Sequence, residues 1–281
     1  MSPSLIASVT DFGHDDPFVG ILKGVVLGIS PSARWIDLTH AVPPGDIRQA
    51  ALAIWQSAAY LPAGSILLAV VDPGVGAGRR AIALAWDHLL AVGPDNGLFS
   101  YLATARPPRQ VIEILPDRID PPQPVSRTFH GRDVFAVAAA RLAAGWPIER
   151  LGEPVSSIVP LASPRLESDS AHRTLTGEVI HVDHFGNALT SIGALQAAGE
   201  RLQLEPWLAQ LPPASYPAPG LYVVWAKTRI PFVATYADVA IGAPLAYIGS
   251  SGLLEIGVNR GRADEALGVR LDDRVQLCYK G

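Results

Sequence analysis

Short apolar runs alternate with longer helical stretches over the first 150 residues of this chain. The runs read LIASVT, WIDLT, SILLAVV, AIALAW, LLAVG and VIEIL, and the helical stretches include PFVGILKGVVLGI and DIRQAALAIWQSAAYL. Runs of this length without strict polar alternation are typical of strands that are buried on both faces of a sheet, with helices as crossovers. The pattern therefore predicts an α/β domain over residues 1–155, built on a mostly parallel, Rossmann-like sheet.

The pattern changes after a stretch that is rich in proline and serine. Residues 156–173 have little periodicity, as expected of a linker between domains. Beyond them the chain consists mainly of short runs with β-branched and aromatic residues, separated by glycine and proline. We therefore expect residues 174–281 to form an antiparallel β-barrel domain, with a helical turn only around GALQAAG, residues 193–199.

Charge and composition exclude several classes of protein. A formal net charge of -4 argues against a nucleic-acid binder, and no basic stripe is present. No apolar run approaches the ~20 residues that span a bilayer, and the N-terminus lacks the pattern of a signal peptide. The only cysteine, Cys278, excludes an intrachain disulfide and a cysteine-based zinc site. We expect a soluble cytoplasmic protein.

Polar side chains follow the predicted strands of the first domain. No phosphate-binding P-loop, dinucleotide fingerprint, G-x-S-x-G elbow or H-E-x-x-H motif is present. Instead, the loops carry Thr10, Asp11, His40, Asp72, Asp95, Asn96, Thr128, His130, Arg132 and Asp133. Each of these residues also has a purely structural interpretation, as a turn, a helix cap or an ion pair.

Three of these loops are expected to meet. The carboxyl ends of parallel strands open on one edge of a sheet, so Asp11, His40 and Asp72 should face one crevice. Acidic groups there suit ribose hydroxyls or a cationic ligand, and they do not suit a polyphosphate. The first of these loops should end where Asp16 caps a helix that begins at Pro17.

Seven motifs in order resemble one enzyme family. They are TDFG with Asp16 downstream, DLTHAVPPGDIRQAA, VVDPGVG, VGPDNGL, TFHGRDVFA, VDHFGN and IGSSGLLEIGVN. Together they are similar to the S-adenosylmethionine (SAM) hydroxide adenosyltransferases, which form adenosine and L-methionine from SAM and water and are relatives of the bacterial fluorinase and chlorinase. The resemblance covers the chain from about Val9 to Asn259.

The resemblance implies an N-terminal α/β domain, a C-terminal β-barrel and a homotrimer with active sites between neighbouring subunits. It implies no cofactor and no metal, because SAM is the substrate. The catalytic trio of the family falls on Asp72, Arg79 and His130, although the adjacent Arg80 leaves the choice of arginine open. By the same motifs, the substrate contacts fall on Asp11 (ribose hydroxyls), Asp183, Asn187, Ser250 and Glu255 (methionine), Asn259 (adenine), Asp16, Phe129 and Phe185.

The identity of the nucleophile separates three hypotheses. A carboxylate beside the reacting carbon repels halide, so Asp72 and His130 favour water and hence a hydrolase. A chlorinase-like SAM halogenase and a non-catalytic sensor of SAM or adenosine are the alternatives. Asp72 should orient the water, and either Asp72 or a neutral His130 could take its proton.

Overall fold

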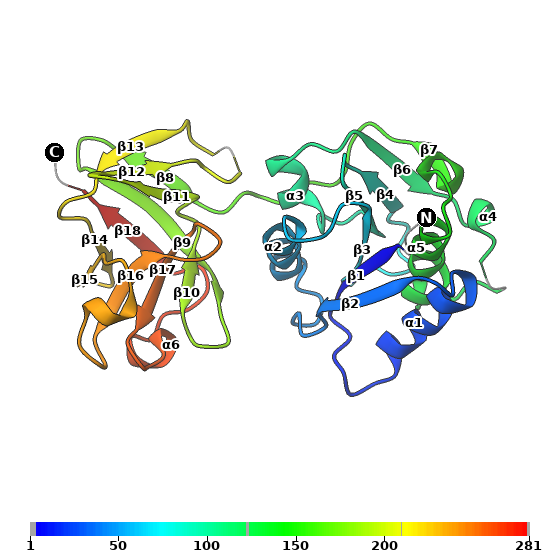
Figure 1. Ribbon diagram of the computed structural model, residues 1–281, viewed down its shortest axis with the longest axis horizontal. Helices are drawn as coiled ribbons and strands as arrows, with labels where there is room; N and C mark the ends of the chain where they lie inside the picture. Colours follow the sequence, from blue (N-terminus) through cyan, green and yellow to red (C-terminus); the bar gives the residue numbers. More distant parts are fainter. Residues whose placement is uncertain (1–3, 122–123, 209, 280–281) are drawn as a thin grey trace. The chain divides into compact units, whose positions relative to one another are not determined.

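The computed structural model describes residues 4–121, 124–208 and 210–279. The chain divides into two compact units, Met1–Leu161 and Ala162–Gly281 (Figure 1). Within the described residues, no helix has both the length and the apolar character needed to cross a membrane.

The first unit contains a seven-stranded sheet in the order β2-β1-β3-β5-β4-β6-β7. The strands are β1 (Leu5–Thr10), β2 (Arg34–Thr39), β3 (Ser65–Val70), β4 (Ala81–Ala85), β5 (Leu89–Pro94), β6 (Gln110–Ile114) and β7 (Gly152–Pro154). Strands β2, β1, β3 and β5 run parallel, whereas β4, β6 and β7 pair antiparallel. The prediction of a mostly parallel sheet therefore holds for only part of it. The short turn between β4 and β5 cannot hold the crossover that a parallel pair needs.

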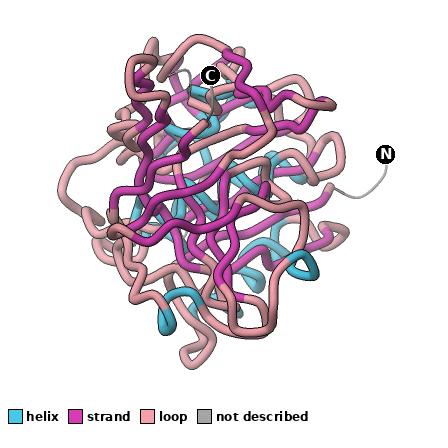
Figure 2. The backbone as a smooth tube through the Cα atoms, turned by 90° about the vertical axis from the view of Figure 1, so that its left-hand side faces the viewer, coloured by secondary structure: helices cyan, strands magenta, loops and turns pink. Residues whose placement is uncertain are grey.

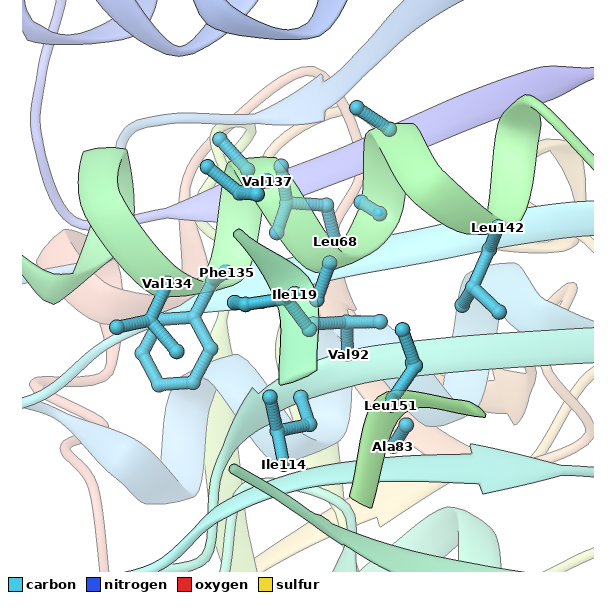
Figure 3. Packing of buried hydrophobic residues seen from close by; sticks show 14 of the residues in the cluster. Leu68, Ala83, Val92, Ile114, Ile119, Val134, Phe135, Val137, Leu142 and Leu151 are labelled. Carbon is cyan, nitrogen blue, oxygen red and sulfur yellow. The ribbon is translucent and has the colours of Figure 1, made fainter. Parts of the chain in front are cut away.

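Helices cover both faces of this sheet. They are α1 (Phe18–Ile29), α2 (Ile47–Ala58), α3 (Ser100–Ala105), α4 (Pro116–Ile119), the π-helix η1 (Gly131–Phe135), α5 (Ala136–Ala143) and the 3₁₀-helix η2 (Ile148–Leu151). On one face, Leu68 of β3 packs in a cluster with Val137 of α5 (Figure 3), and Leu22 of α1 belongs to the same cluster. On the other face, the next residue, Leu67, packs with Ile54 of α2. Burial on both faces explains why the strand sequences are continuously apolar.

The first helix begins one residue later than predicted. Pro17 occupies the N-cap position of α1, no side chain caps the helix there, and the exposed Asp16 precedes it. In contrast, the side chain of Asp46 caps α2 by accepting from the backbone N–H of Gln49 at 3.0 Å. The proline fixes the helical φ at the start of α1 without help from a carboxylate.

The regular secondary structure of the second unit is mainly β-strand (Figure 2). Its main sheet has the order β15-β14-β18-β9-β10-β17-β16, with β8 paired to β9. An isolated bridge between Phe232 and Ala246 links the two edges, so the sheet is a nearly closed antiparallel barrel. The strands are β8 (Leu166–Asp169), β9 (Thr174–Val182), β10 (Ala188–Thr190), β14 (Tyr222–Trp225), β15 (Thr228–Pro231), β16 (Pro244–Ile248), β17 (Leu254–Val258) and β18 (Arg274–Cys278).

A smaller three-stranded sheet and two short helices complete this unit. The sheet is formed by β11 (Leu195–Ala198), β12 (Arg201–Leu204) and β13 (Ala214–Pro217), and the helices are η3 (Tyr236–Asp238) and α6 (Ala263–Ala266). The prediction of a helical turn at residues 193–199 was therefore wrong. Leu195 is buried opposite Leu204 in an antiparallel pair, and this cross-strand burial overrides the helical preference of the alanines.

Residues 156–173, which the sequence suggests are a linker, contribute hydrogen bonds to the first unit and a strand to the second. The backbone N–H of Val159 donates to Asp95 Oδ1 at 2.7 Å, and that of Leu161 donates to Ser100 Oγ at 2.8 Å, both in the first unit. Residues 166–169 form β8 of the second unit. The boundary between the units lies between Leu161 and Ala162.

Candidate active site

A cavity of about 350 Å³ lies at the carboxyl ends of β1 and β3. It is lined by Asp11, Phe12, Pro44, Gly45, Val70, Asp72, Pro73, Val75, Thr128, Phe129, His130 and Gly131. The parallel pairing of the two strands brings Asp11 and Asp72 to the same edge, as the sequence predicts. His130 reaches the cavity from the loop before η1.

Asp72 and Arg79 form a nearly buried ion pair beside this cavity. Their side chains are 6% and 12% exposed, respectively. Arg79 Nε lies 3.0 Å from each carboxylate oxygen, and Arg79 Nη2 also donates to Oδ2. The guanidinium lies 5.0 Å from the centre of the Phe135 ring, which it covers. The carboxylate is therefore held in one orientation by a donor that cannot lose its charge.

The neighbouring arginine has a different partner. Arg80 Nε donates to Asp95 Oδ2 at 2.8 Å, and Arg80 Nη2 donates to the carbonyl of Ser157 at 2.9 Å. The two adjacent arginines therefore serve separate carboxylates. Of the two candidates that the sequence leaves open, Arg79 is the one that contacts Asp72.

His130 joins the pair through the same guanidinium. Its Nδ1 lies 3.0 Å from Arg79 Nη2. Arginine can only donate, so Nδ1 accepts and the proton of the neutral ring sits on Nε2. Burial, followed by the charge of Arg79, lowers the pKa of His130 below its ordinary value, against the opposing charges of Asp72 and Asp133. The ring is thus kept neutral at pH 7.

A buried carboxylate organises the segment that carries His130. Asp133 is fully buried, accepts from the backbone N–H of Ser126 at 2.8 Å and pairs with Arg132 Nε at 2.6 Å. Of the structural interpretations that the sequence allows, the ion pair is therefore confirmed for Arg132 and Asp133. The segment then enters the π-helix η1, a local distortion that is frequent at functional sites.

Aromatic rings form one wall of the site. The centroids of Phe12, Phe18 and Phe129 lie between 5.4 and 6.0 Å apart in edge-on arrangements. A Cβ at Gly131 would come within 3.3 Å of the Phe12 and Phe129 rings, so glycine there lets both rings pack against the backbone. Phe129 is a predicted contact, whereas Phe12, which also lines the cavity and stands inside the TDFG motif, was not singled out from the sequence.

Asp11 is oriented by the loop that follows β2. Its Oδ2 accepts from the backbone N–H of Gly45 at 2.8 Å. Gly45 has φ = +75°, a conformation that favours glycine. Asp16 is exposed and does not line the cavity.

His40 does not face the cavity, contrary to the prediction from strand ends. It is 1% exposed, with Nδ1 2.8 Å from Thr10 Oγ1 and Nε2 2.9 Å from Asp37 Oδ1. Its carbonyl accepts from the backbone N–H of Gly13 at 2.8 Å. The ring therefore turns inward between β1 and β2 and stabilises the loop that carries Asp11.

In the second unit, five polar side chains form a continuous chain of contacts. Asn187 Nδ2 lies 3.0 Å from Asp183 Oδ2, and Asn187 Oδ1 lies 2.9 Å from Tyr236 Oη. The two tyrosine hydroxyl oxygens are 2.7 Å apart. Tyr247 Oη is also 2.7 Å from Glu255 Oε2. Three predicted methionine contacts are thus brought together by two tyrosines that the sequence did not single out.

Two glycines make room for this chain. A Cβ at Gly249 would overlap the Glu255 carboxylate, and a Cβ at Gly257 would come within 2.9 Å of Asn187 Oδ1. These glycines, in the IGSSG and EIGVN sequences, are the signal that could have indicated a crowded polar site.

The remaining predicted contacts are more open. Ser250 is exposed, and Phe185 is 71% exposed. Asn259 donates from Nδ2 to the carbonyl of Val239 at 2.9 Å. Among the residues described in the structure, no group of three or more His, Cys, Asp or Glu side chains could hold a metal ion.

Solved structures and curated proteins resemble this chain over most of its length. A crystal structure of an uncharacterized conserved protein from Thermotoga maritima superimposes with a TM-score of 0.84 at 32% identity, over 97% of this chain and 99% of that one. An (R)-S-adenosyl-L-methionine hydrolase from Thermus thermophilus is 42% identical over 277 residues, or 96% of this chain and 97% of the relative. A fluorinase from an Actinoplanes species is 28% identical over 284 residues, or 91% of each chain.

Both units also match the two domains that define one family. Residues 6–152 match the SAM hydroxide adenosyltransferase N-terminal domain, and residues 177–276 match the SAM hydroxide adenosyltransferase C-terminal domain. These ranges include the Asp72, Arg79 and His130 cluster and the polar chain from Asp183 to Glu255. The chain belongs to the SAM hydroxide adenosyltransferase family.

Proposed function

We propose that this protein hydrolyses SAM to adenosine and L-methionine. The observation that carries the proposal is the cavity at the sheet edge, where Asp72, Arg79 and His130 form one hydrogen-bonded group. The sulfonium of SAM is a stereocentre, and the relatives are named for its (R) form. We therefore take (R)-SAM as the substrate.

The residues divide between the parts of the substrate. Asp11 accepts hydrogen bonds from the ribose hydroxyls, which its orientation by Gly45 supports. Asp183, Asn187, Ser250 and Glu255 receive the ammonium and carboxylate of the methionine, Asn259 contacts the adenine, and Phe129 and Phe185 are further substrate contacts. Asp16 is retained as a substrate contact on the resemblance alone.

Catalysis consists mainly of placing a water in line with the bond that breaks. The sulfonium is a good leaving group, so a water held about 3 Å from the ribose C5′ needs little further activation. Asp72 orients this water with lone pairs that its contacts to Arg79 leave available. Arg79 fixes the carboxylate.

The hydrogen-bond pattern favours Asp72 over His130 as the proton acceptor. His130 Nδ1 is occupied by Arg79, and its Nε2 carries the ring proton, so His130 donates rather than accepts. Water oxygen forms the new bond to C5′, the electrons of the C5′–S bond pass to sulfur, and the released proton goes through Asp72 to solvent. A negative Asp72 beside this position also disfavours attack by chloride or fluoride.

The products distinguish the three hypotheses. We expect incubation with (R)-SAM, with and without chloride, to yield adenosine and methionine on chromatography. In oxygen-18 water, the 5′-hydroxyl of adenosine should carry the label. Formation of 5′-chloro-5′-deoxyadenosine would establish a halogenase, and tight binding without turnover would establish a sensor. Parallel incubation with (S)-SAM tests the proposed stereochemistry.

The proposal includes a homotrimer with active sites between neighbouring subunits, as the family resemblance implies. Sedimentation equilibrium should then give three times the mass of the 29.7 kDa chain. It also includes a cytoplasmic location, since a single buried cysteine creates no need for an oxidising compartment.

The lowered pKa of His130 predicts how the protein responds to acid. An ordinary histidine titrates near pH 6.5, and His130 titrates lower in the folded protein, so the unfolded chain binds the proton first. Stability should therefore fall as the pH drops through about 6.5, while the hydrolysis rate stays constant until the pH is lower still. Urea unfolding between pH 7.5 and 5.5 should show a smaller loss in His130→Asn. The exposed His172 offers the control, since His172→Asn should leave the contribution of His130 in place.

A further inference from the structure

The polar chain of the second unit needs one more hydrogen than its groups supply when both carboxylates are ionised. It contains four contacts in series, from Asp183 through Asn187, Tyr236 and Tyr247 to Glu255, all between 2.7 and 3.0 Å. Each contact requires one hydrogen between its two atoms. The amide of Asn187 supplies one and each tyrosine hydroxyl supplies one, which leaves one contact without a hydrogen.

Turning the Asn187 amide over does not remove this shortage. Its nitrogen would then face Tyr236, and its oxygen would face Asp183 Oδ2, again with no hydrogen between two acceptors. In either orientation the missing hydrogen must sit on one of the two carboxyl groups at the ends. The structure thus requires a protonated carboxylic acid at Asp183 or at Glu255.

Burial and hydrogen bonds decide between the two ends. Asp183 is half-buried, and its Oδ1 accepts from the backbone N–H of Asn187 at 2.8 Å, a contact that favours the ionised form. Glu255 is 8% exposed and packs under Gly249. A buried carboxyl group is costly to ionise, so the proton belongs on Glu255.

We propose that Glu255 is a protonated positioning residue, which donates to Tyr247 and thereby orders Tyr236 and Asn187 toward an ionised Asp183. Every hydrogen in the chain then points from Glu255 to Asp183. Asp183 remains the negative group that meets a cationic ammonium ligand. This inference rests on the proposed function where it concerns methionine. It changes the role of Glu255 from a charged contact of the methionine to a neutral residue that positions Tyr247.

The surroundings of Glu255 are consistent with a neutral acid. Burial raises the pKa of Glu255, and the charge of Asp183 raises it further, against the hydrogen bond to Tyr247. Tyr247 faces it from β16 and Tyr236 from η3. On β10 the residue paired with Glu255 is Leu189, and His181 of β9 lies beyond Leu189 on the same face.

Loss of this proton should weaken ligand binding. When Glu255 ionises, the series of four contacts again lacks one hydrogen. The two oxygen atoms of one 2.7 Å contact must then move apart. Asn187 then loses the partner that orders its oxygen, and Asp183 loses the support of the amide. We expect the KM for SAM to rise as the pH increases through the raised pKa of Glu255, by up to about tenfold per pH unit.

An infrared difference spectrum of the free protein tests the protonation directly. At pH 7 the wild type should show the carbonyl stretch of a protonated carboxyl group that shifts in D₂O, and Glu255→Gln should lack it. The exposed-site control Glu167→Gln should retain it. If the band is absent from the wild type, or persists in Glu255→Gln, the proposal is wrong. No substrate is needed, so failure of the proposed function leaves this result interpretable.

The pH profile of KM tests the positioning role. Glu255→Gln keeps a neutral donor toward Tyr247, so its KM should no longer depend on pH where that of the wild type rises. Glu255→Ala lacks the donor and should have a raised KM throughout, with a much smaller change in kcat. Equal slopes of KM against pH in the wild type and Glu255→Gln would overturn the proposal.

Discussion

Replacing Asp72 with asparagine is expected to lower kcat by about 100- to 1,000-fold while it changes the Kd for SAM little. Asparagine keeps the shape of the side chain but loses the charge that polarises the water and accepts its proton. It also cannot present two oxygen acceptors to Arg79, which donates to both oxygens of Asp72. Single-turnover rates and equilibrium binding of SAM separate the two effects.

A matched control exists in the same sheet. Asp95 pairs with Arg80 as Asp72 pairs with Arg79, and it is similarly buried. Asp95→Asn therefore breaks an equivalent ion pair away from the cavity and should reduce stability with little effect on kcat. If Asp72→Asn greatly weakens binding but leaves the single-turnover rate of bound SAM intact, Asp72 is a binding residue and not a catalytic one.

The strand-end residues illustrate how far the sequence predicts the site. A parallel pair fixes where two strand ends meet, so Asp11 and Asp72 could be placed together from the sequence alone. His40 follows a strand in the same way, yet its ring turns inward to Thr10 and Asp37. Backbone topology places a residue at an edge, but neighbouring hydrogen-bond partners decide where its side chain points.

The antiparallel direction of β4 and the strand at Leu195–Ala198 both depart from the prediction, and they do so for a common reason. The apolar run of β4 predicts a buried strand correctly, but its direction is set by the short turn to β5. Residues 193–199 contain good helix formers, but pairing with β12 makes Leu195–Ala198 a strand. In both cases the deciding interaction lies outside the segment whose pattern was considered.

The tyrosines of the second unit could not be predicted from local pattern. Tyr236 lies in a short 3₁₀-helix and Tyr247 in a strand, and Asn187, which contacts Tyr236, is 49 residues earlier in the chain. The tyrosines matter because their hydroxyl groups meet, which only the folded barrel determines. The family motifs include Asp183, Asn187 and Glu255 but neither of the two tyrosines that connect Asn187 to Glu255.

Replacing Arg79 with lysine is expected to lower kcat about 100-fold although the positive charge is retained. The guanidinium donates from Nε and Nη2 to Asp72 and from Nη2 to His130 Nδ1. A single ammonium group cannot reproduce this planar arrangement of donors. Asp72 should therefore rotate away from the attacking water, and His130 should lose the contact that fixes its proton on Nε2.

The adjacent arginine provides the control, since it has the same chemistry and a separate partner. Arg80→Lys should weaken the contacts to Asp95 and to the carbonyl of Ser157 and cost roughly 1 kcal/mol of stability, with kcat close to that of the wild type. Turnover and urea unfolding of both variants separate the roles. If the two substitutions reduce kcat equally, the loss reflects damage to the loop, and the assignment of Arg79 to the reacting carboxylate fails. A large loss in Arg79→Lys alone means that the donor geometry, and not the charge, supports the attack of water.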